Sequence, residues 1–336
     1  MDLKSKKTAK ERGKRQLSNL LGLDFASSGI KAVRLKKIKE QITLTAADIL
    51  PAIGFNATER PGIPKSLSAY YAALCATTEE ATLRVFSHVL QDEENLQAVV
   101  RDNLSLPEES RVGGMILSRG KGKRESSVLG VAVPEKTVQY FLSLFAGGAP
   151  APHSLELSGL AAFSAFMYNR GAQTAGQTIC LIETGSRFTY AAFFHQNQLQ
   201  IINRFNVGGA SLQKQIQTAL GVDAEMAGTI LSGGSVDVAA PVRQALAPLT
   251  KQLSVYREFV ERQNKSALDG VYLSGGEATS PYWQSAIEGV LGLALVVWSP
   301  FEKLDIAPDA FPEKLKGQES RFAAAVGAAL AGMEET

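Results

Sequence analysis

Three short glycine-containing turns, each following an apolar strand-like run, carry groups that could bind a phosphate and a metal ion. Backbone N–H groups in such turns can point at phosphate oxygens. An acidic side chain at a strand end can hold hydrated magnesium, and glycine lets the backbone approach a ligand closely. The candidate residues in these turns are Asp24, Ser27, Ser28, Lys31, Glu183, Gly185, Ser186, Gly275 and Gly276.

Each of these residues also has a purely structural explanation. Asp24 could cap a turn, Ser27 and Ser28 are common turn residues, and Lys31 could project to solvent. The order of the turns carries more weight than any single turn, because the first two open similar three-stranded units at 20–50 and 178–206. This pattern favours two duplicated halves that face each other across a nucleotide cleft.

The remaining segments alternate between strands and helices, which indicates an α/β protein. Residues 81–134 have the pattern of a small module of their own, and a helix is expected over 66–75. Pro150 and Pro152 predict a break, followed by a short strand at 155–157. Ser158 is expected to cap a helix over 159–168.

Composition argues against a membrane-spanning protein, a zinc site and a Cys–His enzyme. The 336 residues are 45% hydrophobic with a formal net charge of +2, and no apolar run is long enough to cross a bilayer. Two isolated cysteines, Cys75 and Cys180, are typical of a reducing cytoplasm. With only three scattered histidines, a zinc site or a Cys–His enzyme is not expected.

The first fifteen residues are strongly basic, with seven lysines and arginines against two acidic residues. A solvated arm is one interpretation. An arm that contacts an anionic membrane surface through residues 1–15 is the other, at ~1 kcal/mol for each basic residue near the lipid. Nucleic acid is not expected as a partner, because the arm has no aromatic residues for base stacking.

The turns and their flanking residues resemble the actin-like ATPase superfamily, and within it the PilM family of type IV pilus assembly proteins, with FtsA next. The resemblance runs over 21–33, 183–186, 203–209, 271–276 and 323–329. It implies an actin-like fold with two duplicated lobes around a nucleotide cleft and a small inserted α/β subdomain. The implied divisions are an arm at 1–19, a first lobe at 20–172 with the insert at about 81–134, and a second lobe at 173–336 whose final helix is about 322–332.

The resemblance implies ATP and Mg²⁺ as cofactors, with Asp24 and Glu183 near the metal and with Gly208 and Gly209 joining the nucleotide site. The sequence departs from the family pattern in two places. Glu183 stands where the family has Asp, and residues 227–231 lack the Glu and Lys that clasp the nucleoside. We therefore expect at most a weak ATPase, and rather a nucleotide-binding or pseudo-ATPase scaffold.

The implied function is that of a cytoplasmic scaffold of the type IV pilus, or type II secretion-like, inner-membrane platform. The implied partners are a PilN-like bitopic protein, whose tail docks between the insert and the rest of the first lobe, and other platform components. An FtsA-like filament-forming membrane tether is one alternative, although the acidic, small-residue end at 328–336 lacks a basic amphipathic helix. A small-molecule kinase is another, but no carboxylate base stands out for it.

Overall fold

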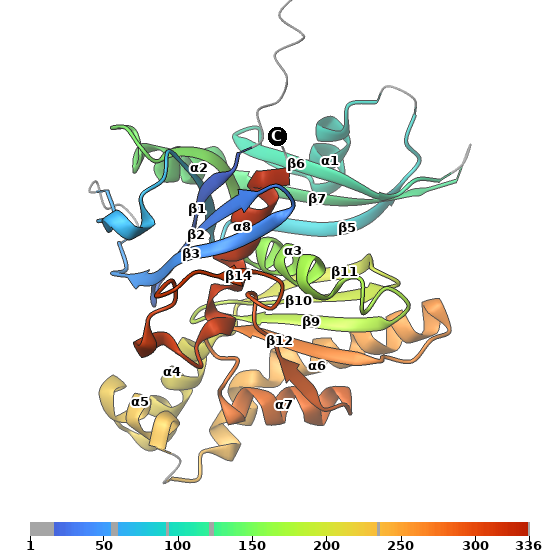
Figure 1. The fold of residues 1–336 in the computed structure, drawn as a ribbon. Coiled ribbons are helices and arrows are strands. Elements are labelled where there is room, and N and C mark those ends of the chain that lie inside the picture. The colour runs from blue at the N-terminus through green and yellow to red at the C-terminus, as the bar shows by residue number, and fades with distance from the viewer. Residues whose placement is uncertain (1–16, 55–59, 92–93, 121–123, 234–235, 335–336) are drawn as a thin grey trace, which may run out of the picture.

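The computed structural model describes residues 17–54, 60–91, 94–120, 124–233 and 236–334. The basic arm at 1–15 therefore lies outside the described residues. Two large sheets, with two helices between them, make up most of the molecule, and a third, smaller sheet lies beside the first (Figure 1). The domain boundaries expected from the sequence stay a prediction.

The first sheet has six strands in the order β14-β3-β2-β1-β4-β8. Its first three strands form an antiparallel meander, because two-residue turns join consecutive strands, whereas β4 and β8 run parallel to β1. The strands are β1 (Asn19–Ala26), β2 (Gly29–Ile38), β3 (Gln41–Leu50), β4 (Tyr71–Ala76), β8 (Ala151–Leu157) and β14 (Asp305–Ile306).

The second sheet repeats this plan with five strands in the order β11-β10-β9-β12-β13. An antiparallel meander again comes first, and β12 then pairs with β9 in parallel. The strands are β9 (Thr178–Thr184), β10 (Thr189–His195), β11 (Gln198–Phe205), β12 (Gly270–Gly275) and β13 (Leu295–Val297). Between β11 and β13 in the chain, the described residues form four helices. They are α4 (Gly209–Leu220), α5 (Ala224–Gly233), α6 (Ala239–Asn264) and α7 (Pro281–Leu291).

The smaller sheet has the order β5-β7-β6 and is covered by one helix. Its elements, β5 (Thr82–His88), α1 (Leu96–Leu104), β6 (Ser110–Ser118) and β7 (Ser126–Pro134), fall within the segment expected as an insert. The tip at 121–123 lies outside the described residues. Helix α2 (Glu135–Ser143) follows directly and packs Phe141 onto Phe25 of the first sheet.

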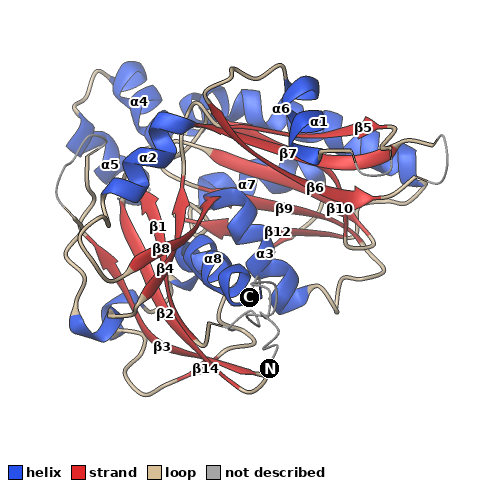
Figure 2. Ribbon diagram, turned by 90° about the horizontal axis from the view of Figure 1, so that it is seen from above, coloured by secondary structure: helices blue, strands red, loops and turns tan. Residues whose placement is uncertain are grey.

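Helices α3 (Ser158–Arg170) and α8 (Ala323–Glu334) fill the space between the two large sheets (Figure 2). Small residues allow the backbones to touch there. A Cβ on Gly22 of β1 would lie 2.0 Å from the carbonyl oxygen of Ala325, and one on Gly327 would lie 1.7 Å from that of Ala161. Glycine at these positions is therefore required by close approach of a strand and a helix, and of two helices.

Two local expectations are wrong. Residues 66–75 do not form a helix: a 3₁₀ turn covers Lys65–Leu67, and β4 occupies Tyr71–Ala76. Five consecutive residues of β4 are buried, as in a central strand covered on both faces, so tertiary packing overrides the local preference. Strand β8 also begins earlier than 155 and includes Pro152, which is tolerated because β8 is an edge strand.

Candidate functional site

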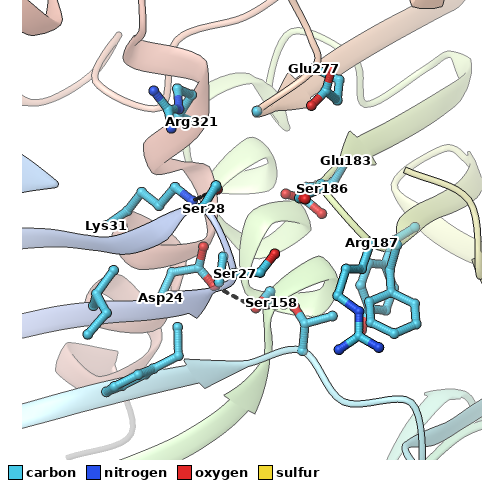
Figure 3. Close-up of a pocket in the computed structure, with 18 of the residues that line it drawn as sticks. Asp24, Ser27, Ser28, Lys31, Ser158, Glu183, Ser186, Arg187, Glu277 and Arg321 are labelled. Carbon is cyan, nitrogen blue, oxygen red and sulfur yellow. Dashed lines mark hydrogen bonds between the residues drawn. The ribbon is translucent and has the colours of Figure 1, made fainter. Parts of the chain in front are cut away.

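The β1–β2 and β9–β10 turns meet across one cleft with a cavity volume of about 230 Å³ (Figure 3). The first turn follows Asp24, and the second follows Glu183, so each large sheet contributes one carboxyl group at a strand end. The cleft is lined by Asp24, Phe25, Ala26, Ser27, Ser28, Ile30, Lys31, Ile53, Thr77, Tyr140, Phe141, Ser158, Glu183, Gly185, Ser186, Arg187, Phe188, Tyr190, Gly276, Glu277 and Arg321.

Asp24 is buried and held by a short relay of hydroxyl groups. Ser158 donates its hydroxyl to Asp24 Oδ1 at 2.6 Å, and Thr77 donates to Ser158 Oγ at 3.0 Å. Burial raises the pKa of Asp24, while Lys31 and the Ser158 hydrogen bond act in the opposite direction. Ser158 is therefore not the helix cap that the sequence indicated: it is the first residue of α3, and its hydroxyl orients a cleft carboxyl group.

Lys31 is buried in the cleft and does not project to solvent. Its Nζ donates to Ser28 Oγ at 2.8 Å and to the Gly29 carbonyl at 3.2 Å. Burial lowers the pKa of Lys31, Asp24 raises it, and Arg321 lowers it further. The cation is thus held against the turn where a phosphate oxygen would bind.

Glu183 faces the same cavity from the second sheet. Burial, reinforced by the nearby Asp24 carboxylate and opposed by Lys31, raises the pKa of Glu183 to about 8. Two carboxyl groups and one lysine in a shared, water-poor space form an electrostatically coupled cluster. A divalent cation would relieve the repulsion between the two carboxyl groups.

The expected glycines divide into two groups. Gly185 and Gly276 line the cavity, whereas Gly208, Gly209 and Gly275 do not. A Cβ on Gly208 would meet the Ser186 carbonyl oxygen at 2.4 Å, and Gly275, at φ +97°, lies against the Thr184 backbone. Gly208 and Gly275 therefore let α4 and the 275–276 turn pack onto the β9–β10 turn, and Gly209 leaves room for the Glu277 side chain. A side chain on Gly276 would enter open space.

Helix α4 is docked on the second turn through its first N–H groups. Gly209 donates to the Gly185 carbonyl at 3.1 Å, and Ala210 donates to that of Ser186 at 2.8 Å. The turn is thereby fixed in position before any ligand binds. Residues 227–231, which lack the family's polar nucleoside contacts, lie on α5 and contribute no lining residue to the cleft.

Several cleft residues were not selected from the sequence. Ser158 and Thr77 come from a helix start and a loop without a motif, and Arg187 follows the second turn and pairs with Glu79. Arg321 directly precedes the small-residue helix, in a polar stretch that carries no motif. Glu277 follows Gly276 directly, so adjacency to a candidate glycine could have identified it.

Two contacts hold the segment after β4 to the second sheet. Arg204 donates to the carbonyl oxygens of Thr78 and Glu79, the latter at 2.7 Å, and its guanidinium lies 5.0 Å from the centre of the Phe188 ring. These backbone carbonyls are within reach because β11 runs beside the 78–79 loop.

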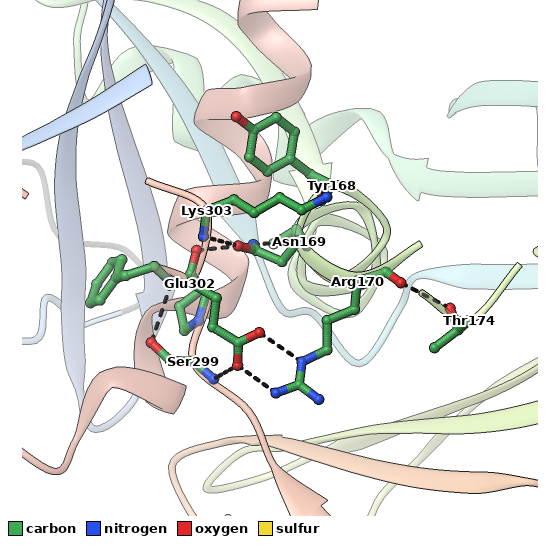
Figure 4. A network of polar contacts seen from close by, with 10 residues as sticks. Tyr168, Asn169, Arg170, Thr174, Ser299, Glu302 and Lys303 are labelled. Carbon is green, nitrogen blue, oxygen red and sulfur yellow. Dashed lines mark hydrogen bonds and ion pairs between the residues drawn. The ribbon is translucent and has the colours of Figure 1, made fainter. Parts of the chain in front are cut away.

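A polar network behind the cleft ties α3 to the loop that follows β13 (Figure 4). Arg170 donates to both carboxylate oxygens of Glu302 at 2.7 Å, and Asn169 donates to the Pro300 carbonyl at 3.0 Å while accepting from the Lys303 N–H at 2.9 Å. Bidentate contacts of this kind fix orientation as well as distance. They hold the helix that carries Ser158.

The residues of the cleft fit a phosphate group with hydrated magnesium. Within the described part of the chain, no group of three or more His, Cys, Asp or Glu side chains is arranged to hold a metal. Mg²⁺ usually keeps several waters and uses only one or two carboxylates together with substrate phosphates. Asp24 and Glu183 would be those carboxylates, and Lys31 with the two turns would contact the phosphate.

Two sheets, each opening with an antiparallel meander and meeting around this cleft with α3 and α8 between them, define the actin-like ATPase fold. A family sequence model described as "Type IV pilus assembly protein PilM" matches residues 159–333, just over half of the chain. The chain therefore belongs to the PilM family of type IV pilus assembly proteins.

One of the solved structures that match the chain shares its fold at a high TM-score, and two others match at lower scores. The PilM–PilN type IV pilus biogenesis complex matches with a TM-score of 0.80 and 19% identity, over 95% of this chain and 99% of that chain. A protein with an actin-like ATPase fold from Bacteroides thetaiotaomicron VPI-5482 matches with a TM-score of 0.44 and 10% identity, over 89% and 94%. The archaeal actin homologue Ta0583 matches with a TM-score of 0.43 and 11% identity, over 95% and 100%. No curated protein sequence matches the chain.

Among the described residues, none of the helices is both long and apolar enough to span a bilayer.

Proposed function

We propose that this protein is a cytoplasmic scaffold of the type IV pilus inner-membrane platform, and that it binds the cytoplasmic tail of a PilN-like membrane protein. Family membership supports the pilus role, and the PilM–PilN complex that shares the fold supports the class of partner. The observation that carries the proposal is a groove of about 470 Å³ between the smaller sheet, α2 and β8. We call it the tail groove.

The tail groove lies between two strand edges. Strand β8 ends the six-stranded sheet, and β6 ends the smaller sheet, so each has one side without a neighbouring strand. Residues 152–157 and 111–113 of these two strands line the groove. Exposed strand edges offer N–H and C=O groups to an added strand, which is a common way of binding an extended peptide.

The walls of the groove set the chemistry of the peptide. Apolar side chains dominate them, including Val133, Val138, Leu142 and Leu160. Three buried polar atoms in the same groove, Thr137 Oγ1, His153 Nε2 and Ser154 Oγ, have no hydrogen-bond partner among the described residues. Buried polar atoms are costly when unpaired, so we expect a short, mainly apolar segment that also brings hydrogen-bonding groups.

The cleft and the tail groove are close enough to influence each other. We propose that a nucleotide in the cleft changes the closure of the two large sheets and thereby the affinity for the tail. The cleft would bind nucleotide, with any hydrolysis weak, because Glu183 replaces the shorter Asp and α5 lacks the polar nucleoside contacts. Helix α8 is buried, so it does not itself offer an apolar face to lipid.

A peptide-binding measurement tests the proposal. The probe is a fluorescent peptide with the sequence of the cytoplasmic tail of the PilN-like protein from the same organism. Leu142→Arg places a charge in the tail groove and should weaken binding at least tenfold, about 1.4 kcal/mol or more. Leu220→Arg makes the same change at an exposed site on α4 and should leave binding unaltered.

Fluorescence anisotropy at constant salt gives both affinities, and thermal melting verifies that both variants fold. Equal loss of binding in the two variants would indicate a general effect of added charge. Full binding by Leu142→Arg would place the tail elsewhere and remove the support for this groove.

A further inference from the structure

Arg321 lies in the wall of the cleft on a short, firmly anchored element. The 3₁₀ helix Glu319–Phe322 ends directly before α8, and Phe322 packs against Phe301 and Phe311 with ring centres 5.9 and 5.5 Å away. The guanidinium also donates to the side-chain carbonyl of Gln318. The base of the side chain is therefore held in one place, and the residue lines the edge of the cavity (Figure 3).

The hydrogen-bonding capacity of Arg321 is not met by the protein. Its Nε is buried without a partner, and none of the described carboxylates lies within ion-pair distance of its guanidinium. Burying a charged donor without an acceptor is unfavourable. An acceptor from outside the chain would remove this cost.

The nearest acidic side chain across this part of the cleft, Glu277, is directed elsewhere. A Cβ on Gly209 would lie 2.1 Å from Glu277 Oε1, so the carboxyl group packs against the first residue of α4. Arg321 and Glu277 influence each other electrostatically without forming an ion pair. Both residues line the cleft, so the unpaired guanidinium is accessible to a ligand there.

We propose that Arg321 recognises the phosphate end of a phosphorylated ligand in the cleft, together with Lys31 from the opposite turn. A guanidinium presents donors in a planar fork that matches phosphate oxygens, and two cations on one cavity favour an anion with more than one negative charge. The Glu277 carboxylate lines the same cleft and repels a bound phosphate, so it opposes phosphate binding. This inference rests on the proposed use of the cleft as a phosphate site.

Isothermal titration calorimetry of the full chain in the presence of Mg²⁺ measures the affinities for three probes, ADP, pyrophosphate and adenosine, and so tests the role of Arg321. Arg321→Gln should weaken ADP and pyrophosphate at least tenfold and leave adenosine unchanged, because only the phosphate contact is lost. Arg321→Lys should recover part of the affinity for pyrophosphate. Arg262→Gln removes an exposed arginine of α6 and should change none of the three affinities.

Glu277→Gln provides a second variant that does not depend on the folding of Arg321→Gln. Loss of the competing carboxylate should strengthen pyrophosphate and ADP binding by about threefold to tenfold. The proposal is overturned if Arg321→Gln binds pyrophosphate as tightly as the parent, if the parent binds neither pyrophosphate nor ADP, or if Glu277→Gln has no effect. Failure of the tail peptide to bind would reject the groove assignment alone, because these probes enter only the cleft.

Discussion

Replacing Glu183 with glutamine tests the electrostatics of the buried carboxyl pair. In the folded protein, burial and the nearby Asp24 raise the pKa of Glu183 from 4.5 to about 8. Between these two values, the folded chain keeps a proton that the unfolded chain has released. Stability must therefore fall as pH rises through this window, since the unfolded state binds fewer protons there.

The size of the effect follows from the same shift. One pKa unit corresponds to about 1.4 kcal/mol, so the full shift sets an upper bound of about 5 kcal/mol at pH above 8. Glu183 is partly accessible from the cleft, so water can solvate its charged form. Solvent screening lowers the expected value to about 2 kcal/mol.

Urea denaturation at pH 5 and pH 8.5, without magnesium or nucleotide, measures this contribution. The parent should lose about 2 kcal/mol more than Glu183→Gln between the two pH values, because glutamine carries no titrating proton. Glu125→Gln changes an exposed carboxylate and should follow the parent. The same pH dependence in the parent and in Glu183→Gln would refute the view that the fold opposes ionisation of this carboxyl group.

Two further substitutions probe the cleft and the helix contact behind it. Gly276→Trp should abolish the rise in melting temperature that millimolar Mg-ATP gives the parent, because its side chain enters the cleft; an equal rise in both would show that nucleotide binds elsewhere. Gly327→Ala should lower the free energy of unfolding by about 1–3 kcal/mol or more, since its Cβ would overlap the Ala161 carbonyl. Gly289→Ala on α7 meets no atom within 4 Å and should stabilise by about 0.5–1 kcal/mol in the same urea titration, because alanine favours a helix more than glycine does. An equal loss of stability in both variants would show that contact with the Ala161 carbonyl is not the cause of the loss at Gly327.

The sequence predicted the meanders and the order of most elements because these depend on local patterns. Alternation marks β1 to β3, and the long apolar stripe marks α6. Strand β4 was missed because its alanines and tyrosine are compatible with a helix, and only its position between β1 and β8 makes it a strand. Short elements such as β14, which depends on pairing with β3, left no local signal.

Some residues of the cleft could be selected from local sequence patterns, whereas others are brought there only by tertiary folding. Asp24 and Glu183 stand at strand ends next to glycine turns, so sequence alone could select them. Ser158 and Arg321 reach the cleft from other elements, and their roles depend on folded distances such as the 2.6 Å hydrogen bond to Asp24. Whether the selected residues bind nucleotide stays a prediction until the binding measurements are made.

The wall that separates the cleft from the tail groove is a single layer of backbone. Thr77 and Ser158 line the cleft, while their neighbours Thr78 and Leu157 line the tail groove. Arg204 of the second sheet holds the Thr78 carbonyl, so movement of the β9–β10–β11 meander bears directly on this wall. If the cleft and the groove bind their proposed ligands, any change in tail affinity caused by the cleft ligand equals the change in cleft-ligand affinity caused by the tail, because coupling between two binding sites is reciprocal.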